Sequence, residues 1–351
     1  AGRNLTTGGG NVVIGYEALR DNNVTEVVIL GARAGLYNSG ADNVFVGNAA
    51  GRNSGAGTDQ VIIGHDAGYY AHNNDVVIIG ESAGYYATGS QNTFVGKDAG
   101  KGGTTSAPYS SGQNNTAVGY GALKGFTTGG SNTVMGYDAG KEITTGGNNV
   151  FIGYQAGESS TDTSNSISIG QGAGRDGDLG DYTTIMGVYA GLNSTGASNV
   201  LLGYKAGFAI GAATTSVIIG AEAAQSSMTT GANGTIAIGN QAGKTLTSGG
   251  GNVIIGDRAG DAMTDNANNT IVGTLAFTTA DSGESNNVII GNSAGGSINN
   301  ADSDSNVIMG YNAGHGGTGE LDRCIAIGAY AMDGTGTVAG QQNIFIGDNA
   351  G

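Results

Sequence analysis

Apolar residues recur along this chain in fixed columns around one repeated glycine. Every unit carries Val, Ile or Thr three residues before the glycine, and Val, Ile, Leu or Met one residue before it. Alanine lies three residues after the glycine in all twenty units, and asparagine lies four residues before it in twelve of them. The repeated glycines are Gly15, Gly31, Gly47, Gly64, Gly80, Gly96, Gly119, Gly136, Gly153, Gly170, Gly187, Gly203, Gly220, Gly239, Gly256, Gly273, Gly291, Gly310, Gly328 and Gly347.

The residues before each glycine predict a short β-strand, as at 12–14, 61–63 and 150–152. β-Branched and bulky aliphatic residues favour strands, and glycine ends the strand because it adopts backbone conformations closed to other residues. The invariant alanine indicates a corner where only a methyl group fits, and the asparagines indicate a ladder of stacked side-chain amides. The polar residues that complete each unit are typical of turns facing water.

The spacing of the glycines selects the fold. It runs from 16 to 19 residues, with one interval of 23 between Gly96 and Gly119. Helical repeats need about 33 residues and propeller blades about 40, whereas a unit of about 17 residues fits one β-coil. We therefore predict an all-β fold, a parallel β-solenoid of about twenty coils, continuous over residues 1–351 with a longer inter-coil loop at 97–118. Both ends match the repeat motif, so we expect a window of a longer array.

The residue two before each glycine predicts association of several chains. Strand side chains alternate between two faces, so this column points outward if the residues one and three before the glycine point inward. Sixteen of its twenty members are Val, Ile, Leu or Phe, and the remaining segments are too polar to supply a covering strand. A second copy of the chain is therefore the expected cover. The predicted interface residues include Val13, Ile29, Phe45, Ile62, Ile78, Phe94, Phe151, Leu201, Ile254 and Phe345.

Composition limits the partners and the chemistry. The formal net charge of -15 disfavours nucleic acid, which needs a basic surface, and no apolar run reaches the roughly 20 residues that insert across a membrane. The single cysteine, Cys324, rules out an internal disulfide framework, and no His or Cys spacing is typical of a metal site. We therefore predict no catalytic residues, no cofactor and no metal.

Tyrosines and one loop are the candidate binding elements. Tyr69 and Tyr70 lie five and six residues after their glycine, and Tyr85 and Tyr86 occupy the same positions in the next unit, so the two pairs are expected to stack. Packing within the ladder or burial between chains is one interpretation; a stacking surface for glycan rings is the other. The 97–118 loop holds Tyr109 and the only proline, Pro108, and loops on rigid scaffolds often carry recognition.

The unit N-V-x-I-G-x-x-A resembles the head repeat of trimeric autotransporter adhesins, the YadA-like β-roll, and similar glycine-rich units occur in bacteriophage tail fibres. The resemblance covers nearly the whole chain, although the adhesin repeat is shorter. It implies a homotrimer, extracellular or on a virion surface, with a structural or adhesive role that is not enzymatic. The longer loops favour a tail-fibre segment, for which a host-surface glycan or receptor is the expected partner. A bacterial adhesin stalk or head is the alternative, and a solenoid polysaccharide-degrading enzyme is a third.

Overall fold

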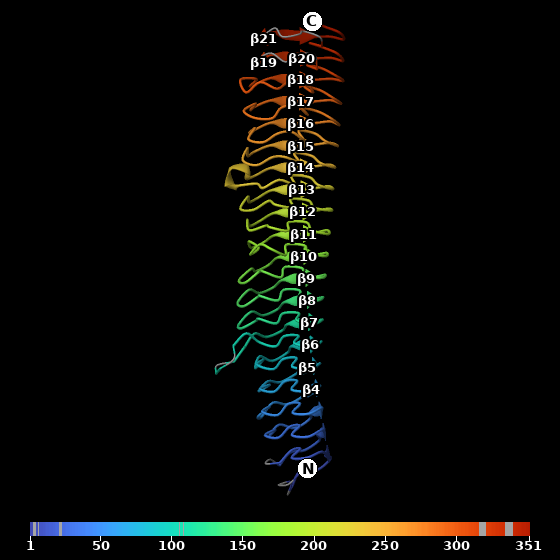
Figure 1. Ribbon diagram of the computed structural model, residues 1–351, viewed down its shortest axis with the longest axis vertical. Coiled ribbons are helices and arrows are strands. Elements are labelled where there is room, and N and C mark those ends of the chain that lie inside the picture. Colours follow the sequence, from blue (N-terminus) through green and yellow to red (C-terminus); the bar gives the residue numbers. More distant parts are fainter. Residues whose placement is uncertain are drawn as a thin grey trace. The chain divides into compact units, whose positions relative to one another are not determined.

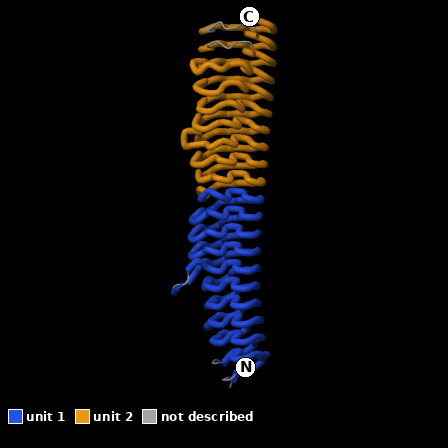
Figure 2. The backbone as a smooth tube through the Cα atoms, in the orientation of Figure 1, with its two compact units in different colours: residues 1–178 blue, residues 179–351 orange. Residues whose placement is uncertain are grey.

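The computed structural model describes residues 1–351 except 3, 4, 6, 21, 22, 105, 108, 316–320 and 334–339. The chain divides into two compact units, residues 1–178 and 179–351 (Figure 2). Each unit is a stack of coils in which every coil gives one short strand to a parallel sheet (Figure 1). The predicted all-β parallel β-solenoid is confirmed, whereas one array running through both units stays a prediction.

Unit 1 forms its sheet from ten strands, each beside the strand of the next coil. The strands are β1 (Val12–Ile14), β2 (Val28–Leu30), β3 (Val44–Val46), β4 (Gln60–Ile63), β5 (Val76–Ile79), β6 (Thr93–Val95), β7 (Thr116–Val118), β8 (Thr133–Met135), β9 (Val150–Ile152) and β10 (Ile167–Ile169). Their register follows the repeated glycine, so that Ile62 pairs with Ile78 and Phe94 pairs with Ala117.

Unit 2 repeats this arrangement and adds two small elements. Its main strands are β11 (Thr184–Met186), β12 (Val200–Leu202), β13 (Val217–Ile219), β14 (Ile236–Ile238), β15 (Val253–Ile255), β16 (Thr270–Val272), β17 (Val288–Ile290), β18 (Val307–Met309), β20 (Ile325–Ile327) and β22 (Ile344–Ile346). Two short strands, β19 (Leu321–Asp322) and β21 (Gly340–Gln341), pair in parallel with each other in a separate sheet, and a short 3-10 helix, η1, covers Thr230–Ala232.

The turn after each strand needs glycine for two physical reasons, as the coil of β9 illustrates. Gly153 has a φ of 138°, and a Cβ there would lie 2.4 Å from the carbonyl oxygen of Gly170 in the next coil. Gly157 has a φ of 59°, and its Cβ would meet the Phe151 ring at 2.7 Å. Between them Ala156 is fully buried, which confirms the predicted corner. The close stacking of the coils and the left-handed backbone conformations thus explain why glycine is needed at both positions.

The strand faces are reversed relative to the prediction from sequence. The column expected to face outward fills the interior: Ile29, Phe45, Ile62, Ile78, Phe94, Phe151, Leu201 and Ile254 are 0% exposed. Val13 and Phe345, in strands β1 and β22, are half-buried. These ten side chains are therefore core residues of the coil, and the prediction that they form an interface between chains is wrong. The outer face carries the columns on either side of them, which are half-buried or exposed.

The interior closes because a second apolar column, seven residues after the glycine, lies opposite the strand. Phe126 and Ile143 belong to this column and are fully buried, and the Phe126 ring lies 5.5 Å from the Phe94 ring. The interior of a coil of this size holds the inward side chain of the strand, the methyl group of the alanine and the side chain seven residues after the glycine. The column is discontinuous in sequence, with Ser54, Ala71 and Ser160 at equivalent positions, so periodicity alone did not reveal it.

The asparagine ladder is present, although most of its hydrogen bonds run from side chain to backbone. The Asn115 Oδ1 accepts from the Asn132 backbone N–H at 3.0 Å, and the Asn132 Oδ1 accepts likewise from Asn149 at 3.0 Å. The Asn132 Nδ2 donates to the Gly146 carbonyl at 3.0 Å and also to the Asn115 Oδ1 at 3.1 Å. These buried amides satisfy backbone groups where the chain enters each strand. Cys324 holds the same position in unit 2 and is buried.

Candidate functional site

Five aromatic side chains of unit 1 form one cluster, which we call the tyrosine cluster: Tyr69, Tyr70, Tyr85, Tyr86 and Tyr109. The Tyr69 and Tyr85 rings stack with centroids 4.9 Å apart and planes 10° from parallel, and those of Tyr70 and Tyr86 stack at 5.9 Å and 11°. Within each coil the two tyrosines meet at 60° or more. The predicted stacking is confirmed, because identical positions of successive coils lie beside each other in a parallel stack.

The long inter-coil loop contributes the fifth tyrosine. The Tyr109 ring stacks 4.5 Å from that of Tyr70 and lies 5.8 Å from that of Tyr86. Burial raises the pKa of Tyr70, and the neighbouring Tyr109 raises it further. Thr105 and Pro108 of the 97–118 loop lie outside the described residues, so the expectation for the proline stays untested. Tyr109 and the two predicted tyrosine pairs are nevertheless brought into one surface.

The ends of the insertion are fixed in the hydrogen-bond ladder. The Gly103 N–H donates to the Phe126 carbonyl at 2.8 Å, which places Gly103 seven residues after its glycine in register with Phe126. The Ser110 carbonyl accepts from the Thr88 N–H at 2.7 Å. In a regular coil, the residue eight positions after the repeated glycine accepts this hydrogen bond from its equivalent in the preceding coil. Residues 104–109 are therefore the six inserted ones, and the coil resumes at Ser110.

An open cavity of about 350 Å³ lies beside the tyrosine cluster. Its lining includes Tyr37, Tyr70 and Tyr109 together with the polar side chains of Asn53 and His72. Aromatic walls with a few polar groups are typical of small-ligand sites. The spacing of residues along the chain did not predict Tyr37 and His72 as part of this cavity, because their place in it depends on the packing of neighbouring coils.

Arg52 anchors one end of the tyrosine cluster. Its guanidinium lies over the Tyr69 ring, 5.2 Å from the centroid, and donates to the Tyr69 hydroxyl. Burial, with a further contribution from Asp66, raises the pKa of Tyr85 to about 12. The Tyr85 hydroxyl therefore stays neutral and able to donate a hydrogen bond over the physiological range.

A second candidate surface is the outer face of each sheet. Met135 is 45% exposed in strand β8 of unit 1, and Met186 is 45% exposed in strand β11 of unit 2. The tyrosines that directly follow the glycine extend this face in unit 1, where Tyr120, Tyr137 and Tyr154 stack at 5.1 and 5.2 Å. The outer face thus presents two columns, of mostly aliphatic residues, whereas one outward column was predicted from the sequence.

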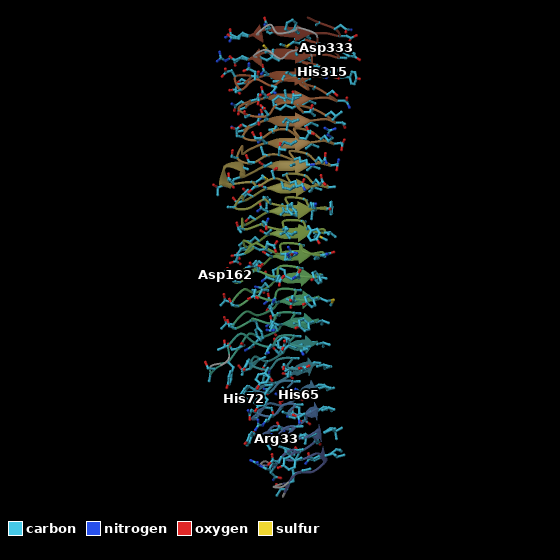
Figure 3. The ribbon with its side chains drawn as sticks, in the orientation of Figure 1. Arg33, His65, His72, Asp162, His315 and Asp333 are labelled. Atoms are coloured by element: carbon cyan, nitrogen blue, oxygen red, sulfur yellow. The ribbon has the colours of Figure 1, made fainter. Side chains whose placement is uncertain are left out.

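The described residues contain no group of three or more His, Cys, Asp and Glu side chains that could hold a metal ion. Among them there is also no helix of the length and apolarity that a membrane crossing requires. His65 and His72 belong to unit 1 and His315 belongs to unit 2 (Figure 3). In a scan against family models no model matches the chain, and a search of curated proteins finds no match.

Proposed function

We propose that this chain is the shaft of an extracellular fibre that assembles with copies of itself and adheres through the tyrosine cluster. The parallel β-solenoid of each unit is compatible with a structural or adhesive shaft. Of the two kinds of extracellular fibre, we favour a homotrimeric bacteriophage tail fibre on a virion surface over a bacterial surface adhesin. The resemblance of the repeat to both classes and its longer inter-coil loops support this order.

The observation that carries the proposal is the exposed apolar outer face. Val77 in β5 and Ile167 in β10 are 36% and 37% exposed although they are aliphatic residues in regular strands. Contiguous apolar surface of a few hundred Å² on a soluble protein marks an interaction site. A second copy of the chain presents the same periodic ridge, so two such faces can pack in register.

Adhesion is assigned to the tyrosine cluster because its aromatic faces stay half-exposed beside a cavity. Tyrosine offers an apolar face and a hydroxyl on a side chain with few rotatable bonds, which suits the stacking of sugar rings. The assignment requires no catalysis, and we propose that the chain is not an enzyme.

The mass of the assembly in solution tests the proposal. Analytical ultracentrifugation or native mass spectrometry of the whole chain should give three times 34.5 kDa. A folded monomer at micromolar concentration would contradict the fibre assembly. An assembled protein that shows no affinity for any glycan would leave a shaft without the adhesive role.

A further inference from the structure

Three of the six lysines of the chain occupy one column of unit 1, five residues after the repeated glycine. They are Lys101, Lys124 and Lys141, in three consecutive coils. Tyr69 and Tyr85 hold this position in the two preceding coils, so the column changes from aromatic to cationic next to the tyrosine cluster. In a chain with a net charge of -15, such a concentration of ammonium groups is a local feature that the fibre role alone does not require.

The three lysines border a cavity of about 320 Å³. Tyr86, from the tyrosine cluster, lines this cavity, and so do Gly102 and Gly125. These glycines hold the sixth position after the repeated glycine, where Tyr70 and Tyr86 stand in earlier coils. The absence of side chains at these two positions leaves room beside the Tyr86 ring.

Carboxylates behind the lysines hold the ammonium groups in place. Asp98 pairs with Lys101 at 3.1 Å and with Lys124 at 3.2 Å, and it is only 7% exposed. Burial by itself raises the pKa of Asp98, but the hydrogen bonds from the two lysines outweigh it and leave that pKa below its usual value. Each of these ammonium groups has three N–H donors, and each of these ion pairs uses one. The ion pairs with Asp98 therefore leave two N–H donors on each of Lys101 and Lys124, and both lysines line the cavity.

The charge around the cavity is nearly balanced. Lys141 pairs with Asp138 at 3.5 Å and with Glu158 at 3.4 Å, and Glu142 also borders the cavity. Three ammonium groups therefore face four carboxylates, counting Asp98, so the sum is 3 − 4 = −1. An anionic ligand gains little from such a site, whereas hydroxyl groups can use both its donors and its acceptors.

We propose that this lysine cavity is a subsite for a neutral saccharide, which stacks on Tyr86 and accepts hydrogen bonds from Lys101 and Lys124. The inference rests on the proposed adhesive function and deepens it. Tyr86 and Tyr109 are 5.8 Å apart and border the lysine cavity and the cavity beside Tyr70, respectively. One oligosaccharide can therefore contact the tyrosine cluster and the lysine cavity together.

The test compares Lys124→Gln with Lys244→Gln in the whole chain. Lys244 occupies the same column in unit 2 and pairs with Glu222 at 3.0 Å, but it has no tyrosine cluster beside it, so it is a matched control. The probe is a printed array of neutral and uronic-acid-containing oligosaccharides, followed by calorimetry with the best neutral binder. Loss of a charge-assisted hydrogen bond should weaken binding by about tenfold in Lys124→Gln and leave Lys244→Gln unchanged.

Three outcomes would overturn the inference. If Tyr70→Ala abolishes binding while Lys124→Gln binds as the wild type, the tyrosine cluster alone is the site and the adhesive function stands. A preference for acidic sugars that falls steeply with added salt would exclude the neutral class. If the wild type binds no sugar on the array, the inference and the adhesive role fail together. Circular dichroism melting of each variant separates loss of binding from loss of fold.

Discussion

Residue by residue, the alanine column shows how little space each coil corner allows. Ala139 is 0% exposed, as are Val134 and Ile143 of the same coil. Ala139→Leu should lower the free energy of unfolding by about 1–3 kcal/mol, because added methylenes force a packed core apart. Thr128→Leu, at an exposed turn position of the preceding coil, is the control and should change little. Urea denaturation measures both, and equal effects would show that the corner is not closed.

Glu284 is a buried carboxyl with an incomplete set of partners. Its Oε2 accepts from the Asn266 Nδ2 at 2.6 Å, whereas its Oε1 has no hydrogen-bond partner among the described residues. Burial raises the pKa of Glu284 above its ordinary value of 4.5. The native state therefore binds this proton more tightly than the unfolded chain, so the stabilising contribution is present below about pH 4.5 and is lost as the pH rises through the native pKa.

Glu284→Gln should accordingly stabilise the protein at neutral pH, because a neutral amide costs less to bury than an ionised carboxylate. At a pH below the ordinary carboxyl pKa, the variant and the wild type should unfold alike, because both side chains are then neutral. Thermal melting as a function of pH provides the measurement. A variant that is less stable than the wild type at every pH would mean that the carboxylate is needed where it stands.

Within a single strand, neighbouring residues serve different purposes. In strand β8, Val134 is 0% exposed and Met135 is 45% exposed. Val134→Lys should unfold the coil, because it places a charge in the interior without a partner. Met135→Lys should leave the circular dichroism spectrum intact and weaken assembly, since it places like charges in the proposed interface. Sedimentation separates the two effects, and a Met135→Lys variant that assembles as the wild type would move the interface elsewhere.

The insertion at residues 104–109 behaves as a separate element, because both of its ends are in ladder register. Deleting these six residues brings Gly103 directly before Ser110 and restores a 17-residue interval between Gly96 and Gly119. The shortened protein should fold and assemble, since loop length changes closure entropy only slowly. It should lose affinity for glycans, because Tyr109 is removed. Unchanged glycan binding on the array would make the loop a neutral insertion.

For the whole molecule, the charge and the apolar outer face act in opposite directions. Each chain carries a formal charge of -15, so three chains carry 3 × (−15) = −45. Repulsion between exposed charges is screened over about 10 Å at 0.1 M salt and over about 3 Å at 1 M, whereas apolar contacts are not weakened by salt. The proposed trimer should therefore dissociate more readily at low salt and become more stable as salt is added. Sedimentation velocity across a salt series measures this, and dissociation on adding salt would indicate an interface held by ion pairs.

The sequence determined the repeat and its backbone. The columns of glycine, alanine and β-branched residues fixed the strand positions, the register and the fold class, because coil contacts are local and identical from one unit to the next. The stacking of Tyr69 on Tyr85 followed from the same periodicity. Such features need only the spacing of residues along the chain and the geometry of a parallel sheet.

Which side of the strand faces the core depends on the packing of the whole coil. A short run such as Val150–Ile152 is apolar at all three positions, so alternation alone cannot distinguish the inward residue. The opposing column of Phe126 and Ile143 decides it, because the interior has room for one strand side chain per coil. The cavities beside Tyr70 and Lys124 likewise depend on side chains from several coils meeting at one edge, which spacing along the chain does not specify.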